Sequence, residues 1–144
     1  MIKNERQYRI TKAYAEKFEH TIAAVAARPK RSLHPALRKA EADGLKSQMN
    51  DLKQELREYE ALRSGKCRVI ALDSIEELPK TLIQARIAAG LSQQELAAKL
   101  GLKPQQVQRY EATNYQSASL ERVNAIVRVL GVTLRHRAEV RLVS

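Results

Sequence analysis

The sequence predicts a mainly α protein with a small β element. In the first half, two stretches repeat apolar residues at alternating steps of three and four, the heptad spacing of helices that pack along a seam. Between Leu91 and Glu111, short helices are predicted on either side of a glycine corner. The last residues change to a period of two, which is typical of a strand. We therefore expect an N-terminal helical arm over residues 1–66 and a compact domain over residues 67–144.

The first helix of the arm is predicted over about residues 11–27. Asn4 and Gln7 have the spacing of a capping box, but Thr11 is the favoured N-cap, and the polar residues before it are expected to be frayed. Pro29 disfavours helix in the residue before it, so the helix should end there. The seam of this helix is predicted to consist of Tyr8, Thr11, Ala15, Phe18, Ile22 and Val25.

The second helix of the arm is predicted from His34-Pro35 to about Arg63, with Ser64-Gly65 as its end. Its seam covers only about two to three heptads, which is short for an isolated coiled coil. The simplest solution is an antiparallel hairpin of the two helices, and a coiled coil between two subunits is the alternative. Either arrangement makes the arm an interaction module without evident chemistry. The predicted seam residues are Leu45, Met49, Leu52, Leu56 and Tyr59.

The stretch LSQQELAAKLGLKPQQVQRYE, Leu91 to Glu111, predicts two helices that meet at a tight corner. Ser92 and Glu95 have capping-box spacing. Gly101 follows the last apolar residue of the first helix, where a left-handed cap favours glycine. Pro104 is in place for the first turn of the second helix.

The second of these helices has two unlike edges. Val107 and Tyr110 form an apolar edge that should face the core, whereas the other edge carries amides and one guanidinium. Glutamine can pair with adenine, and arginine with guanine, in the major groove of DNA. The alternative is a helical hairpin whose glutamine-rich face only meets solvent. The residues of the polar edge are Gln105, Gln106, Gln108 and Arg109.

This stretch resembles the helix-turn-helix of the XRE family, the phage-repressor-like transcriptional regulators. The resemblance extends over Ile83–Gly90 upstream and Ser119–Gly131 downstream, and it covers somewhat under half of the chain. It implies a repressor-like domain of about four to five short helices. It also implies that Arg86 and Glu111 form a buried structural ion pair.

The resemblance further implies a set of DNA contacts. Gln105, Gln106 and Arg109 occupy the base-reading positions of the family. Lys103 stands where the family usually has a Ser or Thr cap, and Ala112-Thr113 replace a frequent Asn-Gly, which puts the contacts after that helix in doubt. The expected contacts to the DNA backbone are Gln93, Gln94, Lys103, Gln108 and Asn114.

The flanks of this region predict further elements. A short turn is expected at 74–78, followed by a helix from Pro79 to about Ala89. The β-prone run 67–72 and the alternating tail 132–143 are expected to pair as strands, within the chain or across a dimer axis. His136 in the tail is expected to be structural.

The composition narrows the possible functions. Lys and Arg number 26 against 16 Asp and Glu, for a net charge of +10, which favours a polyanionic partner. Cys67 is the sole cysteine, which suits a reducing cytoplasm, and we expect no redox role for it. We expect no cofactor, no metal site, no signal peptide and no membrane span, and therefore a cytoplasmic protein.

These observations favour a transcriptional regulator, a probable repressor, that reads operator DNA as a homodimer on an inverted repeat. The alternative is an antitoxin that resembles those of bacterial toxin–antitoxin pairs, in which the arm would neutralise a toxin protein. An enzyme is not expected, because no nucleophile with a base, phosphate-binding loop or metal cluster is evident.

Overall fold

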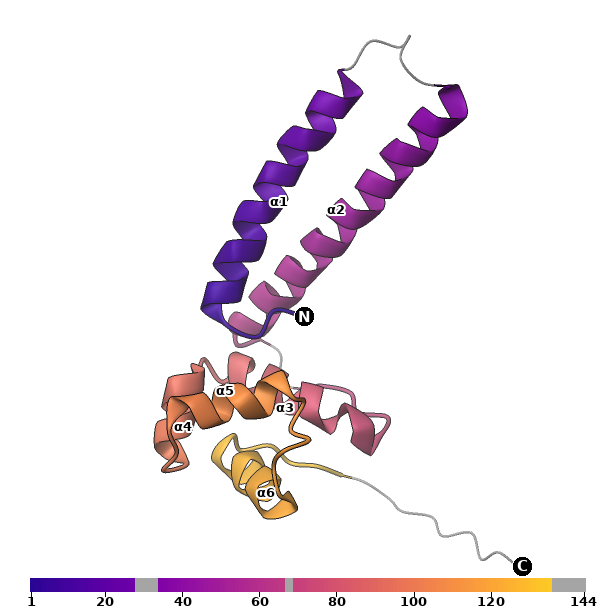
Figure 1. Ribbon diagram of the computed structural model, residues 1–144. Helices are drawn as coiled ribbons and strands as arrows, with labels where there is room; N and C mark the ends of the chain where they lie inside the picture. Colours follow the sequence, from indigo (N-terminus) through magenta and orange to yellow (C-terminus); the bar gives the residue numbers. More distant parts are fainter. Residues whose placement is uncertain (28–33, 67–68, 136–144) are drawn as a thin grey trace, which may run out of the picture.

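The computed structural model describes residues 1–27, 34–66 and 69–135. Two long helices, α1 and α2, lie side by side as an arm that stands on a compact part built from the remaining helices (Figure 1). The described helices are α1 (Glu5–Ala26), α2 (Pro35–Arg63), the short 3-10 helix η1 (Ile75–Glu77), α3 (Leu78–Ala88), α4 (Gln93–Lys99), α5 (Pro104–Ala112) and α6 (Leu120–Val129).

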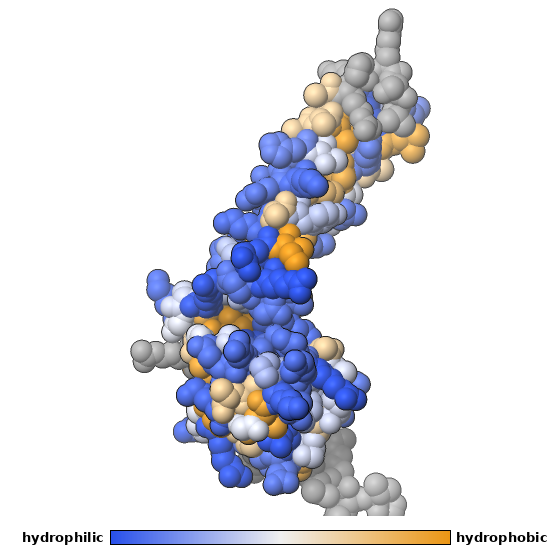
Figure 2. Space-filling model, turned by 60° about the vertical axis from the view of Figure 1, so that its left-hand side comes forward, coloured by the Kyte–Doolittle hydropathy of each residue, from blue (hydrophilic) through white to orange (hydrophobic). Residues whose placement is uncertain are grey.

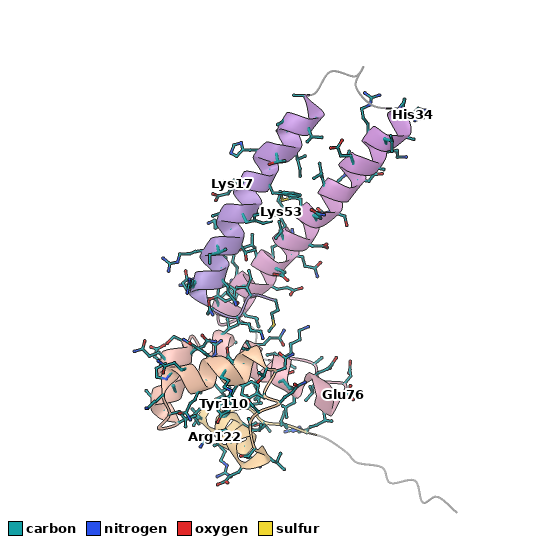
Figure 3. The ribbon with its side chains drawn as sticks, in the orientation of Figure 1. Lys17, His34, Lys53, Glu76, Tyr110 and Arg122 are labelled. Carbon is teal, nitrogen blue, oxygen red and sulfur yellow. The ribbon has the colours of Figure 1, made fainter. Side chains whose placement is uncertain are left out.

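The arm is an antiparallel hairpin within one chain, with the heptad seam between its helices. In α1, all six predicted seam residues are at least partly buried, and every other residue of the helix is exposed. In α2, the predicted seam is likewise buried or half-buried, and Leu62 extends it. Lys53 lies between the two helices (Figure 3), where its Nζ is 2.6 Å from Glu19 Oε1. This contact lowers the pKa of the Glu19 carboxyl.

The predicted start of α1 at Thr11 is wrong. The helix begins at Glu5, and the Asn4 side chain accepts a hydrogen bond from the backbone N–H of Gln7. The residues before the cap are not frayed, because Ile2 is only 3% exposed in the core. Tertiary packing of these residues therefore fixes a cap whose spacing was visible in the sequence.

The predicted limits of α2 are confirmed. His34 is its N-cap at the far end of the arm (Figure 3), and Nδ1 of its ring accepts from the backbone N–H of Ala36. Pro35 occupies the first turn, and the helix ends at Arg63 with Ser64 as its C-cap. Helix α1 also ends as expected, at Ala26.

The compact part (η1 and α3–α6) encloses an aliphatic core. Helix α3 follows η1 directly and begins one residue before the predicted Pro79. Each of the helices α3–α6 contributes at least one side chain to the core. Buried and exposed positions alternate at helical spacing, which orients each helix toward the core. The fully enclosed apolar side chains are Leu82, Ile83, Leu96, Ala97, Val107 and Ile126.

The base of the arm shares this core. Ile2, Tyr59 and Leu62 belong to the same cluster of buried residues as the side chains of α3–α6. The ring of Tyr8 stacks on Tyr59 with centroids 5.1 Å apart. The arm is therefore packed onto the compact part rather than joined to it by the chain alone.

The caps set the corner between α4 and α5. The Ser92 side chain accepts from the Glu95 N–H, and the Glu95 carboxylate accepts from the Ser92 N–H at 2.8 Å, which completes the predicted capping box. These hydrogen bonds lower the pKa of Glu95. Helix α4 ends at Lys99, and Gly101 follows its C-cap with a φ of 66°. The N–H of Leu102 donates back to the Ala97 carbonyl in a Schellman motif.

Helix α5 ends in the same way without glycine. Asn114 has a φ of 47°, and the N–H of Tyr115 donates to the Tyr110 carbonyl at 2.7 Å. Asparagine tolerates the left-handed region better than most residues. Asn114 thus supplies the left-handed residue after α5 that Gly101 supplies after α4.

The predicted β element is not supported. Residues 69–72 and 132–135 form no strand, and the remaining parts of the two predicted strands, including Cys67 and His136, lie outside the described residues. Ile70 and Leu72 instead pack against the helical core while Val69 is 85% exposed. These β-prone residues therefore pack against the helical core without a partner strand.

Candidate nucleic-acid interface

Helix α5 presents its polar edge to solvent. Val107 is fully buried and Tyr110 is half-buried, and Tyr110 lies between α5 and α6 in the view of Figure 3. The opposite edge is exposed at all four predicted positions, which are Gln105, Gln106, Gln108 and Arg109. The helix can therefore be approached by a large ligand along this edge.

The side chains of this edge differ in their freedom. Gln106 Oε1 accepts from the backbone N–H of Lys103 at 3.0 Å, so its amide oxygen helps to cap α5. Lys103 is the N-cap residue and is itself exposed. Gln105 and Arg109 make no side-chain hydrogen bond among the described residues, which leaves their polar groups open to a ligand.

The buried carboxylate of Glu111 connects three helices of the compact part. Glu111 is fully buried, and Arg86 donates to both of its oxygens, at 2.6 Å from Nε and 2.9 Å from Nη2. Gln93 Nε2 donates to Glu111 at 2.7 Å. Charge-assisted bonds of this kind are short and strong, and here they join α3, α4 and α5 around one group.

The same network reaches the arm. Arg86 Nη2 donates to the Lys3 carbonyl at 2.7 Å, and Arg86 Nη1 donates to the Leu91 carbonyl at 2.8 Å. Lys3 Nζ donates to the Glu111 carbonyl at 2.6 Å and to Asn114 Oδ1 at 3.4 Å. The chain in front of α1 is thus held to α3 through Arg86 and to the end of α5 through Glu111 and Asn114.

The predicted backbone-contact residues surround α5. Gln94 and Gln108 are exposed, and Gln93 is half-buried because it bonds Glu111. Asn114 is exposed in the turn after α5, where its side-chain Oδ1 accepts a hydrogen bond from Lys3 Nζ. The arm residue Lys3 therefore lies beside predicted contact positions. Sequence reasoning missed it, although the Asn4–Gln7 spacing was a signal that the chain is ordered there.

Tyr115 has an unusual environment next to this turn. It is 5% exposed with a φ of 59°, and its ring stacks near Tyr110 with centroids 6.3 Å apart. Burial strongly raises the pKa of its hydroxyl, which has no hydrogen-bond partner among the described residues. Tyr115 is thus a packed ring in this structure.

The described part of the chain shows neither a metal-ion site nor a membrane-spanning helix. Residues 1–27, 34–66 and 69–135 contain no group of three or more His, Cys, Asp or Glu side chains placed to hold a metal ion. None of the described helices is long and apolar enough to cross a membrane.

Comparison with known proteins identifies the region around α4 and α5. Residues 82–136 match the family model of the helix-turn-helix, a family of DNA-binding regulators that are not typically enzymes. No curated protein and no solved structure matches the chain. The match begins within α3 and takes in α4, α5 and α6, so it includes the three helices that the Glu111 carboxylate joins. Residues 82–136 therefore form an XRE-type helix-turn-helix domain, which supports DNA-binding transcriptional regulation.

Proposed function

We propose that the protein is a sequence-specific transcriptional regulator, a repressor, that inserts α5 into the major groove of operator DNA. The observation that carries the proposal is the exposure of the polar edge of α5 in a matched helix-turn-helix domain. In this proposal residues 67–144 are the DNA-binding domain and residues 1–66 are an arm for oligomerisation or partner binding.

The roles of the exposed side chains follow from their donors and acceptors. Arg109 and Gln105 make direct contacts with base edges, since neither side chain is committed within the described protein. Gln106 also contacts a base, through the amide nitrogen that its capping bond leaves available. Contacts to phosphates from Gln93, Gln94, Lys103, Gln108 and Asn114 fix the position of the domain on the duplex.

One helix reads too few base pairs to select an operator, so we propose a homodimer on an inverted repeat. The half-sites would be separated by about one helical turn, roughly 34–36 Å. Footprinting of the region upstream of the gene tests this, and protection of a two-fold symmetric site is the expected result. Protection without such symmetry would contradict the dimeric arrangement.

A variant test separates base reading from backbone binding. Arg109→Ala should relax discrimination at one base pair by about 1–3 kcal/mol, because a bidentate contact to guanine is lost. Gln94→Ala, on the exposed start of α4, should weaken cognate and scrambled duplexes by the same factor. Equal losses on both duplexes for Arg109→Ala would overturn the base-reading role.

The second candidate function is an antitoxin. It is favoured by two apolar side chains one turn apart on the outside of the arm, Ile10 at 60% and Tyr14 at 54% exposure. Exposed apolar surface on one face of a helix suits a protein partner. Co-expression with the product of an adjacent reading frame, followed by size-exclusion chromatography, tests this function. A stable complex that Tyr14→Ala dissociates would support it, and an unchanged homodimer would count against it.

A further inference from the structure

A groove lined mostly by polar and charged residues lies where the first turn of the arm meets α4 and α5. Its volume is about 860 Å³, and residues 3–7 of the arm form one side of it. The other side includes Gln93, Gln94 and Gln108, three of the residues proposed to contact the DNA backbone. On the face shown in Figure 2, the surface where the arm joins the compact part is mostly hydrophilic. The groove is therefore continuous with the proposed DNA interface.

The charges of the groove favour an anion. Four basic and two acidic side chains line it. Arg63 is paired with Glu5 at 2.5 Å, and the Arg86 charge is balanced by the buried Glu111. Among the lining residues, these pairs leave two positive charges, on Lys3 and Arg6, against one carboxylate, on Glu95. That carboxylate is engaged in the α4 capping box.

Arg6 is placed where it does not help its own helix. It is the second residue of α1, directly after Glu5, and the positive end of the helix dipole lies at this terminus. Arg6 is exposed and makes no ion pair with any residue that the structure describes. A cation in a first turn is locally unfavourable, so the charge of Arg6 does not stabilise α1 and is available to a ligand outside the protein.

We propose that the first turn of the arm is part of the DNA-binding surface, with Arg6 and Lys3 bound to the phosphodiester backbone that flanks the bases read by α5. This inference rests on the proposed function. Lys3 supports it because hydrogen bonds from its Nζ to the Glu111 carbonyl at 2.6 Å and to Asn114 Oδ1 at 3.4 Å hold the ammonium group beside the turn proposed to contact phosphates. The arm then has a role in DNA affinity in addition to any role in assembly.

The test measures DNA affinity of the full chain as a function of salt. Arg6→Gln removes the charge without removing a contact made within the described protein. Losing one phosphate contact should lower the affinity for cognate and scrambled duplexes alike by about five- to tenfold in 0.1 M salt, and should reduce the salt slope by about one unit. The control is Lys46→Gln. Lys46 is an exposed residue of α2 that does not line the groove, so its substitution removes an equal charge and should leave the salt slope unchanged.

Further readouts separate the inference from folding and from the proposed function. The melting temperature of Arg6→Gln should be unchanged or slightly raised, and Arg6→Glu should lose more affinity for DNA than Arg6→Gln.

An affinity and a salt slope of Arg6→Gln equal to those of the wild type would overturn the inference. A specificity change in Arg109→Ala would in that case leave the proposed function standing. Wild-type protein that binds duplexes without discrimination would overturn the proposed function, and the Arg6 slope would still decide the inference. Absence of any DNA binding would overturn both.

Discussion

In the arm, two helices of 22 and 29 residues share a single seam, whereas the helices of the compact part enclose a core from several sides. The seam leaves most of its apolar residues half-exposed, and of the six predicted positions in α1 only Ala15 is buried. The compact core instead holds side chains without any exposure, such as Leu96 and Ile126. Packing in one layer thus stabilises a long hairpin, and a closed core supports the exposed polar edge of α5.

The largest expected effect comes from the network that joins the two regions. Arg86→Leu should destabilise the protein by about 3–5 kcal/mol, because Glu111 would remain buried without its cation. Urea unfolding followed by circular dichroism measures the change. Because Arg86 also holds the Lys3 carbonyl, the arm and the compact part should both lose stability.

The double variant Arg86→Leu/Glu111→Leu is the control for this effect. It should recover much of the lost stability, since replacing both partners of a buried pair by apolar residues is often neutral. If the single variant costs under about 1 kcal/mol, the network does not hold the two regions together.

A matched pair of substitutions compares the two cores directly. Leu96→Ala should cost about 3–4 kcal/mol, because its side chain is fully enclosed, and Leu52→Ala in the half-buried seam should cost about 1–2 kcal/mol. The free energy of unfolding from urea titrations provides both numbers. Equal costs would mean that the seam is as closed as the compact core, for example through a second subunit.

Alanine substitutions at two glycines should change the stability of the two regions in opposite directions. Gly44 lies inside α2 with nothing within 4 Å of an added Cβ, so Gly44→Ala should stabilise the arm by about 1 kcal/mol. Gly101 has a φ of 66° at the end of α4, so Gly101→Ala should destabilise the compact part by about 1–2 kcal/mol. Thermal unfolding measures both changes. A loss of stability in Gly44→Ala would show that α2 is not continuous through residue 44.

The smallest expected effect is the pH dependence of the α4 capping box. The pKa of Glu95 is lowered from its ordinary value of 4.5 in the folded protein, mainly by hydrogen bonding to the Ser92 backbone N–H. Its contribution to stability is therefore present above about pH 4.5 and is lost as the pH falls through the lowered folded pKa. The difference in melting temperature between the wild type and Glu95→Gln, measured against pH, should shrink on acidification. A difference that does not change between pH 6 and about pH 3 would contradict this assignment.

The elements that could be predicted from the sequence are those with local signals. The capping box at Ser92, the left-handed Gly101 and the heptad positions each depend on neighbours in the chain, and the structure has all three. The start of α1 could not be predicted, because Asn4 is preferred over Thr11 only when Ile2 is buried against distant helices.

The candidate site shows the same limit. The polar edge of α5 follows from its helical period, so the exposure of Arg109 was predictable. The approach of Lys3 to Asn114 joins residues that are 111 positions apart, and no local pattern contains it. The strand prediction was wrong for the described residues 69–72, because β-prone residue types do not supply a partner strand, and Ile70 and Leu72 pack against the helical core instead.

The ring pairs offer a built-in optical probe. The chain has five tyrosines and no tryptophan, and each tyrosine stacks against another ring. Near-ultraviolet dichroism and intrinsic emission therefore arise from three places: the foot of the hairpin at Tyr8 and Tyr59, the outer face of α1 at Tyr14, and the end of α5 at Tyr110 and Tyr115. Docking of a duplex or of a second polypeptide could be followed at these wavelengths without attaching a dye.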